Sequence, residues 1–381
     1  METQNHILIA DIGTESIKTA LIRQKKNEIV AQKIVSGYLD EYNDYNGKDF
    51  GLNVVCKAVI SSAKEVLDKL SVKPLIFCIN LPITILKGAI SRQTIDRDRP
   101  ATVIDAREVS LICGKVSAKA QEEISQNYAT DAGIMPEDIE FRTFKIVELK
   151  IDGYEVPHLQ GFTGKTIEAK ILATFLPKTA FGYLSKIVKS MGLGKLIITH
   201  EAQNLVRYIE QEKSGGIFLD IGGDVTQIFF AKNGKLEGIR ELKSGSRAFS
   251  AAISYTLGIN MVEARILKEK YVKKILSKDV ESRIREIIIP FMTQWYEDLK
   301  GRIKETRIMM PSDVFVFGGG AEFPEIQDIL ASGNWGGFPM ISAPQMKILY
   351  PKDIKKVEIP VNFGSDPRYT PISLICRNYA N

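Results

Sequence analysis

Two short segments of the sequence carry residue types that can bind phosphate and magnesium. Asp11 and Asp220 each end a run of apolar, strand-forming residues, and a glycine-containing turn follows each of them, within residues 11–16 and 220–226. Backbone N–H groups exposed in such a turn can bind phosphate oxygens. A carboxylate at the strand end can hold Mg²⁺ through water, because Mg²⁺ keeps much of its hydration. One such turn is common without any ligand, but two copies in equivalent surroundings favour one shared site.

A third segment places Gly318, Gly319 and Gly320 directly after the predicted strand 313–317. Glycine has no Cβ, so a flat ligand can approach the backbone closely at such a loop. The alternative is a loop that only leads into the next helix. That role does not need three glycines in succession, so we expect a ligand here.

The segments between these three alternate between strand-like and helix-like patterns, which is typical of an α/β fold. The chain opens with a predicted hairpin over residues 6–11 and 16–22. The second Asp segment repeats this layout, with a returning strand over residues 227–231 and a hairpin turn at Asn233 and Gly234. Further strands are predicted over residues 101–104, 144–151, 166–175, 195–199 and 313–317. Helices are predicted over residues 53–70, 107–119, 180–191, 248–257, 262–276 and 280–307, and from residue 201.

The repeat of the Asp segments predicts two related halves that face a cleft. Residues 81–177 differ in pattern from the rest of the chain, since they contain short predicted strands and frequent Pro and Gly. We interpret them as an inserted subdomain. Residues 38–49 are predicted to form a solvated loop, and the tail after residue 333 is predicted to be irregular.

Composition excludes several other classes of protein. The 381 residues carry 51 Lys and Arg against 46 Asp and Glu, and a net charge of +5 does not indicate a nucleic-acid partner. The four cysteines are far apart and the three histidines are scattered, so neither a disulfide scaffold nor a His-built metal site is expected. The longest uncharged apolar stretch, residues 75–86, is shorter than the ~18 residues of a spanning helix. With no segment like a signal peptide, we expect a cytoplasmic protein.

The three glycine-containing segments, in this order, resemble the two phosphate motifs and the adenosine motif of the actin-like ATPase superfamily. The resemblance implies an actin-like α/β fold, with ATP and Mg²⁺ bound between its halves. It implies that Asp11 and Asp220 face the metal through water, and that Glu201 orients the water that attacks the γ-phosphate. The implied nucleotide contacts are Gly13, Thr14, Ser16, Lys18, Gly222, Gly223, Asp224, Thr226, Arg265, Lys268, Gly318, Gly319, Gly320 and Phe323.

Within the superfamily, the sequence resembles the FtsA family of bacterial cell-division proteins and the PilM family of pilus-assembly proteins. The inserted subdomain falls in the first half, where both families carry an insert (an SHS2 domain). Arg265 and Lys268 match the end of the FtsA helix motif Ala-Glu-x-x-Lys, with Arg in place of Glu. This resemblance places residues 1–80 and 178–200 in the first half, 81–177 in the insert and 201–381 in the second half. Residues 232–310 would then form the smaller subdomain of the second half.

The resemblance implies three alternative functions. An FtsA-like protein would self-associate into filaments and link the FtsZ division ring to the inner face of the cell membrane. A PilM-like protein would be a cytoplasmic scaffold that binds a peptide of a membrane partner. A small-molecule kinase on the same fold is the third, but the sequence shows no catalytic Asp for an acceptor hydroxyl. The stretch 161–175 favours FtsA. The absence of a C-terminal amphipathic stretch favours PilM, and we take the FtsA-like function as the first hypothesis.

The second phosphate motif departs from the superfamily pattern at two positions. Asp224 stands where a third Gly is usual, and Val225 stands where Thr is usual. A like-charge pair at ~5 Å in an effective dielectric of ~20 costs about 3 kcal/mol. We therefore expect ATP binding with slow or absent hydrolysis.

Overall fold

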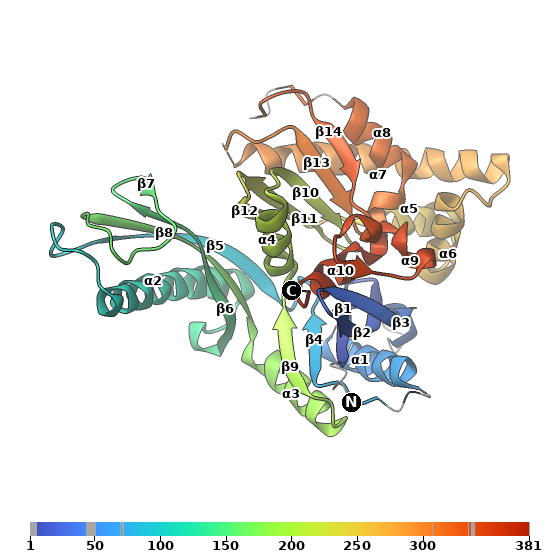
Figure 1. Cartoon of the computed structure of the whole chain (residues 1–381). Helices are drawn as coiled ribbons and strands as arrows, with labels where there is room; N and C mark the ends of the chain where they lie inside the picture. The colour runs from blue at the N-terminus through green and yellow to red at the C-terminus, as the bar shows by residue number, and fades with distance from the viewer. Residues whose placement is uncertain are drawn as a thin grey trace.

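A computed structural model describes residues 6–42, 51–68, 70, 72–306, 308–333, 335–336 and 340–380. Its strands form three sheets, with six, five and four strands (Figure 1). The six-stranded and five-stranded sheets build two halves, and the four-stranded sheet projects to one side of them (Figure 1). This is the α/β arrangement that the sequence predicts.

The first half is built on the six-stranded sheet, in the order β15-β3-β2-β1-β4-β9. Its strands are β1 (His6–Ile12), β2 (Ser16–Lys25), β3 (Glu28–Tyr38), β4 (Ile76–Asn80), β9 (Lys195–Thr199) and β15 (Val357–Glu358). Every residue of β1 is buried, because both faces of the sheet are covered. Helices α1 (Leu52–Leu67) and α3 (Lys178–Ser190) share a core with one face, and α10 (Thr370–Arg377) packs on the other.

The second half repeats this plan on the five-stranded sheet, in the order β12-β11-β10-β13-β14. Its strands are β10 (Gly216–Ile221), β11 (Thr226–Lys232), β12 (Lys235–Leu242), β13 (Asp313–Phe317) and β14 (Gln345–Ile348). Helices α5 (Ser246–Leu257), α6 (Met261–Val272), α7 (Lys278–Lys304) and α8 (Pro324–Ser332) contribute to the core on one face, and α4 (Glu201–Glu212) to the core on the other. In each half an antiparallel hairpin is followed by a parallel neighbour of its first strand, β4 beside β1 and β13 beside β10.

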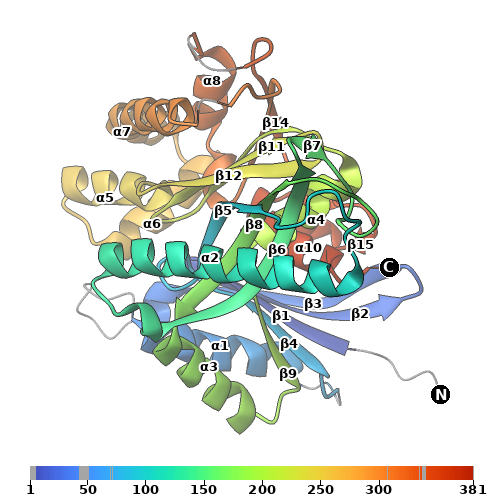
Figure 2. The same cartoon turned by 90° about the vertical axis from the view of Figure 1, so that its left-hand side faces the viewer.

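The four-stranded sheet, in the order β5-β8-β6-β7, lies between residues 87 and 177 of the chain. Its elements are β5 (Lys87–Asp96), α2 (Ala106–Ala132), β6 (Ile139–Ile151), β7 (Tyr154–Glu155) and β8 (Thr166–Pro177). Helix α2 runs across one face of this sheet (Figure 2). The buried Lys170 of β8 joins the sheet to the second half, since it pairs with Glu148 of β6 at 3.1 Å and with Glu237 of β12 at 2.8 Å.

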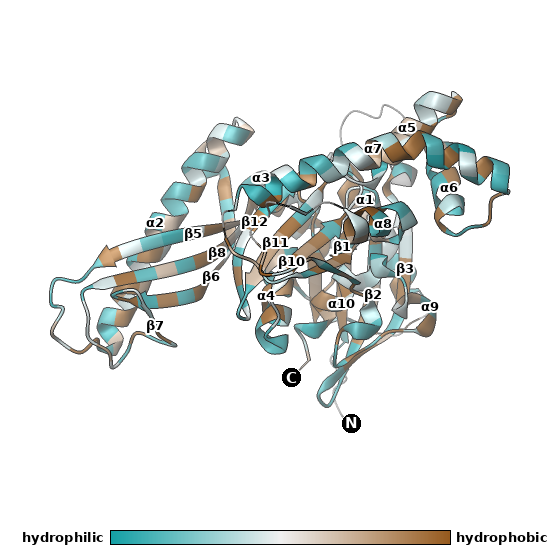
Figure 3. Ribbon diagram, turned by 90° about the horizontal axis from the view of Figure 1, so that it is seen from above, coloured by the Kyte–Doolittle hydropathy of each residue, from teal (hydrophilic) through white to brown (hydrophobic). Residues whose placement is uncertain are grey.

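Hydrophobic residues gather at the centre of the molecule, on strands β1, β10 and β11, whereas the outer helix α2 alternates between hydrophobic and hydrophilic residues (Figure 3). Within the described residues, no helix has the length and apolar character needed to cross a membrane. The remaining short elements are η1 (Leu39–Tyr42), η2 (Pro136–Asp138), η3 (Gly319–Glu322), η4 (Pro351–Asp353), α9 (Val361–Gly364) and η5 (Pro367–Tyr369).

Several predicted elements are confirmed, and others are wrong. The strands predicted over residues 195–199 and 313–317 are β9 and β13, and the predicted Asn-Gly turn is present, with positive φ at both residues. The predicted strand 101–104 is a loop. Its carbonyl groups are taken by other partners, since Thr102 accepts a hydrogen bond from Arg97 Nη2 at 3.0 Å.

The predicted irregular tail contains β14 and α10, because its short apolar runs pack against both halves. The predicted helix 107–119 continues to Ala132, where Gly133 caps it in the left-handed conformation. Most of the predicted loop 38–49 lies outside the described residues.

Candidate active site

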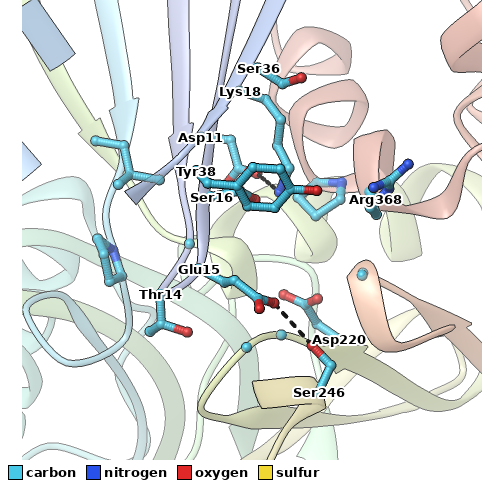
Figure 4. Close-up of a pocket in the computed structure, with 18 of the residues that line it drawn as sticks. Asp11, Thr14, Glu15, Ser16, Lys18, Ser36, Tyr38, Asp220, Ser246 and Arg368 are labelled. Atoms are coloured by element: carbon cyan, nitrogen blue, oxygen red, sulfur yellow. Dashed lines mark hydrogen bonds and ion pairs between the residues drawn. The ribbon is translucent and has the colours of Figure 1, made fainter. Parts of the chain in front are cut away.

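A cavity of about 150 Å³ lies between the two halves, where the hairpins β1–β2 and β10–β11 face each other (Figure 4). Its wall also includes α6, the loop after β13 and the start of α10. Twelve of the predicted site residues line it: Asp11, Gly13, Thr14, Ser16, Lys18, Asp220, Gly222, Gly223, Lys268, Gly318, Gly319 and Phe323.

The two hairpin tips have the same backbone closure. The N–H of Gly13 donates to Ser16 O at 2.9 Å, and the N–H of Gly222 donates to Val225 O at 3.1 Å. A side chain at the second tip would collide with the first tip, because a Cβ on Gly223 would lie 2.8 Å from Thr14 Oγ1. The glycines therefore permit the two tips to approach each other, as the repeated motif predicts.

Acidic side chains gather on the strand ends behind the tips. Asp11 accepts a hydrogen bond from Asn80 Nδ2 at 2.9 Å and pairs with Lys18 Nζ at 3.4 Å. Burial, followed by the charge of Asp11, raises the pKa of Asp220 to about 7. The site therefore concentrates negative charge where the fold provides little solvent to stabilise it.

Glu201 lies at the start of α4 and is 1% exposed. Neither of its carboxylate oxygens has a hydrogen-bond partner. Burial, followed by the charges of Asp220 and Asp11, raises the pKa of Glu201 well above its ordinary value. An orphaned buried carboxylate of this kind fits a site that takes up a cation or a polarised water.

These residues fit a hydrated Mg²⁺ rather than a cage of protein ligands. Among the described residues, no three His, Cys, Asp or Glu side chains lie close enough to hold a metal ion together. Mg²⁺ usually keeps several waters and takes one or two carboxylates together with substrate phosphates. Asp11 and Asp220 are suited to that arrangement.

The loop after β13 closes the other end of the cavity. Gly318 has a φ of 86°, and a Cβ there would collide with the carboxylate of Asp220. Arg368, from the start of η5, pairs with Glu322 at 3.1 Å and with Asp366 at 2.7 Å. Burial outweighs the opposing charge of Arg368 and raises the pKa of Glu322 to about 7.

The other predicted site residues lie around the cavity rather than in its lining. Asp224 pairs with Arg247 Nε at 3.2 Å, so its charge is already matched. Thr226 is fully buried, donates to Ser244 O and accepts from the Trp295 indole. The role of both residues as nucleotide contacts stays a prediction, as does that of Glu201.

Arg265 and Gly320 also lie behind the cavity wall. Arg265 pairs with Asp40 at 3.1 Å, and its guanidinium carbon lies 3.5 Å from the centre of the Tyr38 ring. Gly320 packs directly on Ile221, where a Cβ would collide. Both positions support the residues that face the cavity.

Several lining residues are absent from the sequence prediction: Glu15, Ser36, Tyr38, Asn80, Ser246, Glu322 and Arg368. Glu15 stands inside the first predicted motif, so its position could have indicated it. Arg368 and Tyr38 are distant in sequence from every motif, and only the packing of α10 and β3 beside the second half brings them to the cavity.

No protein-family model matches the sequence, and no curated protein sequence matches it. Solved structures do match the structure of this chain. A PilM–PilN type IV pilus biogenesis complex superposes with a TM-score of 0.68 at 15% identity, over 97% of this chain and 98% of that one. The ethanolamine utilization protein EutJ from Carboxydothermus hydrogenoformans superposes with a TM-score of 0.51 at 15% identity, over 98% of this chain and 89% of that one. The chain has the actin-like ATPase fold. At these identities the likeness establishes the fold, including two halves around a central cleft.

Proposed function

We propose that this chain is an ATP- and Mg²⁺-binding switch whose closure controls the binding of a protein partner at the cell membrane. The observation that carries the proposal is the pair of equivalent glycine turns, which face each other across a cleft lined by Asp11 and Asp220. Such turns bind phosphate oxygens through backbone N–H groups, and carboxylates behind them suit a hydrated Mg²⁺.

Each group has a defined role in this proposal. The turns at Gly13 and Gly222 bind the phosphates, and Lys18 supplies positive charge beside Asp11. Asp11 and Asp220 would hold a hydrated Mg²⁺ through water, and the ion would supply positive charge beside the phosphates. Glu201 orients the water that attacks the γ-phosphate. Asp224 forms an ion pair with Arg247, so the charge of this arginine is not free to act on the phosphates. We therefore propose slow or absent hydrolysis.

Closure of the cleft can change the contacts of the four-stranded sheet of residues 87–177. That sheet is joined to strand β12 by Lys170, and Lys87 pairs with Glu241 of the same strand at 2.8 Å. Because β12 belongs to the second half, a rotation of that half moves or breaks these ion pairs. Nucleotide state would thereby alter the surface that the inserted sheet offers to a partner.

We propose a peptide of a membrane protein as this partner, in the manner of the PilM–PilN complex. Superposition over nearly the whole length of both chains supports this alternative over the FtsA-like link to FtsZ, which the stretch 161–175 favours. In either case the protein would act at the inner face of the membrane and associate with further copies of itself.

Two binding measurements distinguish these partners. The first titrates the purified chain into a labelled cytoplasmic peptide of a PilN-type protein from the same organism. The second measures co-sedimentation with FtsZ polymers from that organism, and both are made with and without ATP and Mg²⁺. We expect nucleotide-dependent binding of the peptide and no pelleting with FtsZ. Nucleotide-sensitive pelleting without peptide binding would replace the pilus function with the division function.

A further inference from the structure

The side chain of Glu15 crosses the cleft from the first hairpin tip to the second half of the molecule. Its carboxylate accepts hydrogen bonds from Lys268 Nζ at 3.0 and 3.3 Å. It also accepts one from Ser246 Oγ at 3.3 Å (Figure 4). Lys268 lies on α6 and Ser246 opens α5, so both donors belong to the second half. The carboxylate therefore ties the two halves together directly.

Glu15 is negatively charged in this position. Burial is the largest single effect and would raise its pKa, but Lys268, Arg247 and Ser246 together outweigh burial and hold the pKa below its ordinary value. The side chain of Lys268 is 7% exposed and that of Glu15 is 19% exposed, so water screens the pair only in part. A buried lysine is costly without an anion, and Glu15 supplies that anion.

The neighbouring residue Thr14 also contacts the second half. Its Oγ1 accepts a hydrogen bond from the N–H of Asp224 at 2.9 Å, and its carbonyl oxygen accepts one from Arg247 Nη2. The donors used by Thr14 and Glu15 are an ammonium, a guanidinium, a hydroxyl and a backbone N–H. These are the groups that bind phosphate oxygens in proteins.

The cavity beside these contacts is small. Its volume of about 150 Å³ compares with roughly 300–1,000 Å³ for the sites of drug-sized ligands and cofactors. Glu15, Ser246 and Lys268 all line this cavity, so a phosphate group bound beside Lys268 and Ser246 competes with the Glu15 carboxylate for the same donors.

We propose that Glu15 is an internal substitute for a phosphate group, which holds the cleft closed without nucleotide and lowers the affinity for nucleotide. The phosphates of an entering nucleotide displace the Glu15 carboxylate from Lys268 and Ser246 and take their hydrogen bonds. This inference rests on the proposed function, because it assigns the donors of the same cleft to nucleotide phosphates.

The test replaces Glu15 with its neutral isostere, Glu15→Gln. Calorimetric titration with ATP–Mg²⁺ and with ADP–Mg²⁺ compares this variant with the wild type. We expect the variant to bind about tenfold more tightly or better, since removal of a competing charge worth about 1.4 kcal/mol gives that factor. Glu28→Gln is the matched control, because Glu28 is exposed at the start of β3 and the charge change is the same.

Hydrogen exchange of the nucleotide-free proteins provides a second measurement. We expect faster exchange in residues 13–16 and 222–225 of Glu15→Gln than in the wild type, because the halves separate more often. Glu15→Ala should change both measurements in the same direction. Equal or weaker nucleotide binding by Glu15→Gln would overturn the inference. If neither protein binds nucleotide, the proposed function fails, and the exchange rates alone decide: unchanged protection would overturn the inference, and lost protection would support it.

Discussion

Replacement of Asp220 by Asn should stabilise the protein in the absence of metal and abolish its response to ATP and Mg²⁺. Asp220 lies at the end of β10 and faces the cavity. Burial and the nearby charge of Asp11 raise its pKa from 3.8 to about 7. Between these two pH values the carboxyl is ionised in the unfolded chain and protonated in the folded chain. The stability that this group contributes is therefore full below pH 3.8 and is lost as the pH rises to about 7.

The expected size of the effect follows from the shift in pKa. One unit corresponds to about 1.4 kcal/mol, so the shift amounts to about 4 kcal/mol of lost stability above pH 7. Asp220 keeps part of its surface open to the cleft, and solvent screening reduces this to about 3 kcal/mol. For cooperative unfolding of 381 residues, that change raises Tm by about 4 °C.

The assay is thermal unfolding of wild type and Asp220→Asn at pH 8 and at pH 4, in EDTA and then with ATP and Mg²⁺. We expect the variant to be more stable in EDTA at pH 8 and the two proteins to be alike at pH 4. Nucleotide and metal should stabilise only the wild type, by about 2.7 kcal/mol at a hundredfold excess over Kd. Asp98→Asn, at an exposed position, controls for the change in net charge. A variant that is no more stable than the wild type in EDTA at pH 8 would refute the account of Asp220.

Three further predictions concern residues around the site. Burial, with a smaller effect from Lys87, lowers the pKa of His200 from 6.5 to about 3, so the free energy of unfolding should fall by about 1.4 kcal/mol per pH unit below pH 6.5. His200→Asn should remove this part of the pH dependence of the free energy of unfolding. The same pH dependence in the variant and the wild type would contradict the prediction. Gly318→Ala should lower the free energy of unfolding by about 1–3 kcal/mol and weaken nucleotide binding, because Gly318 has a positive φ and no room for a Cβ. Gly182→Ala is the control, since there is open space for a Cβ at this position of α3, and it should raise the free energy of unfolding by about 0.5–1 kcal/mol. Asp224→Gly should raise ATP turnover by releasing Arg247, and unchanged turnover would mean that Asp224 does not restrain hydrolysis.

The local parts of the site could be predicted from sequence because their signals are local. A carboxylate at a strand end and a glycine turn lie within a few residues of each other, so the chain itself brings Asp11 and Gly13 together. The repeat at Asp220 and Gly222 then placed a second copy in an equivalent position, and the two tips do face each other. The strand of residues 313–317 was equally clear, because it is a short, apolar run that ends in glycine.

The parts that depend on long-range packing could not be predicted. Arg368 reaches the cavity because η5 and α10 fold back onto the first half, and no periodic pattern in the tail indicated this. The ion pair between Glu15 and Lys268 joins residues far apart in sequence. From the sequence alone, a carboxylate next to a glycine turn is expected to be exposed to solvent, because the sequence does not show its partner. The predicted strand 101–104 failed for the same reason, because the backbone of Ile104 bonds to Gly161 and Phe162, which are distant in sequence.

The most direct test of the nucleotide cleft is calorimetric titration of ATP into the purified chain, with Mg²⁺ and with EDTA, for the wild type and for Asp11→Ala. Asp11 is buried, is held by Asn80 and Lys18, and lines the cavity. We predict that the wild type binds ATP more tightly with Mg²⁺ than without it, and that Asp11→Ala loses the Mg²⁺-dependent binding. An unchanged affinity and an unchanged Mg²⁺ dependence in the folded variant would contradict the assignment of this cleft to ATP and Mg²⁺.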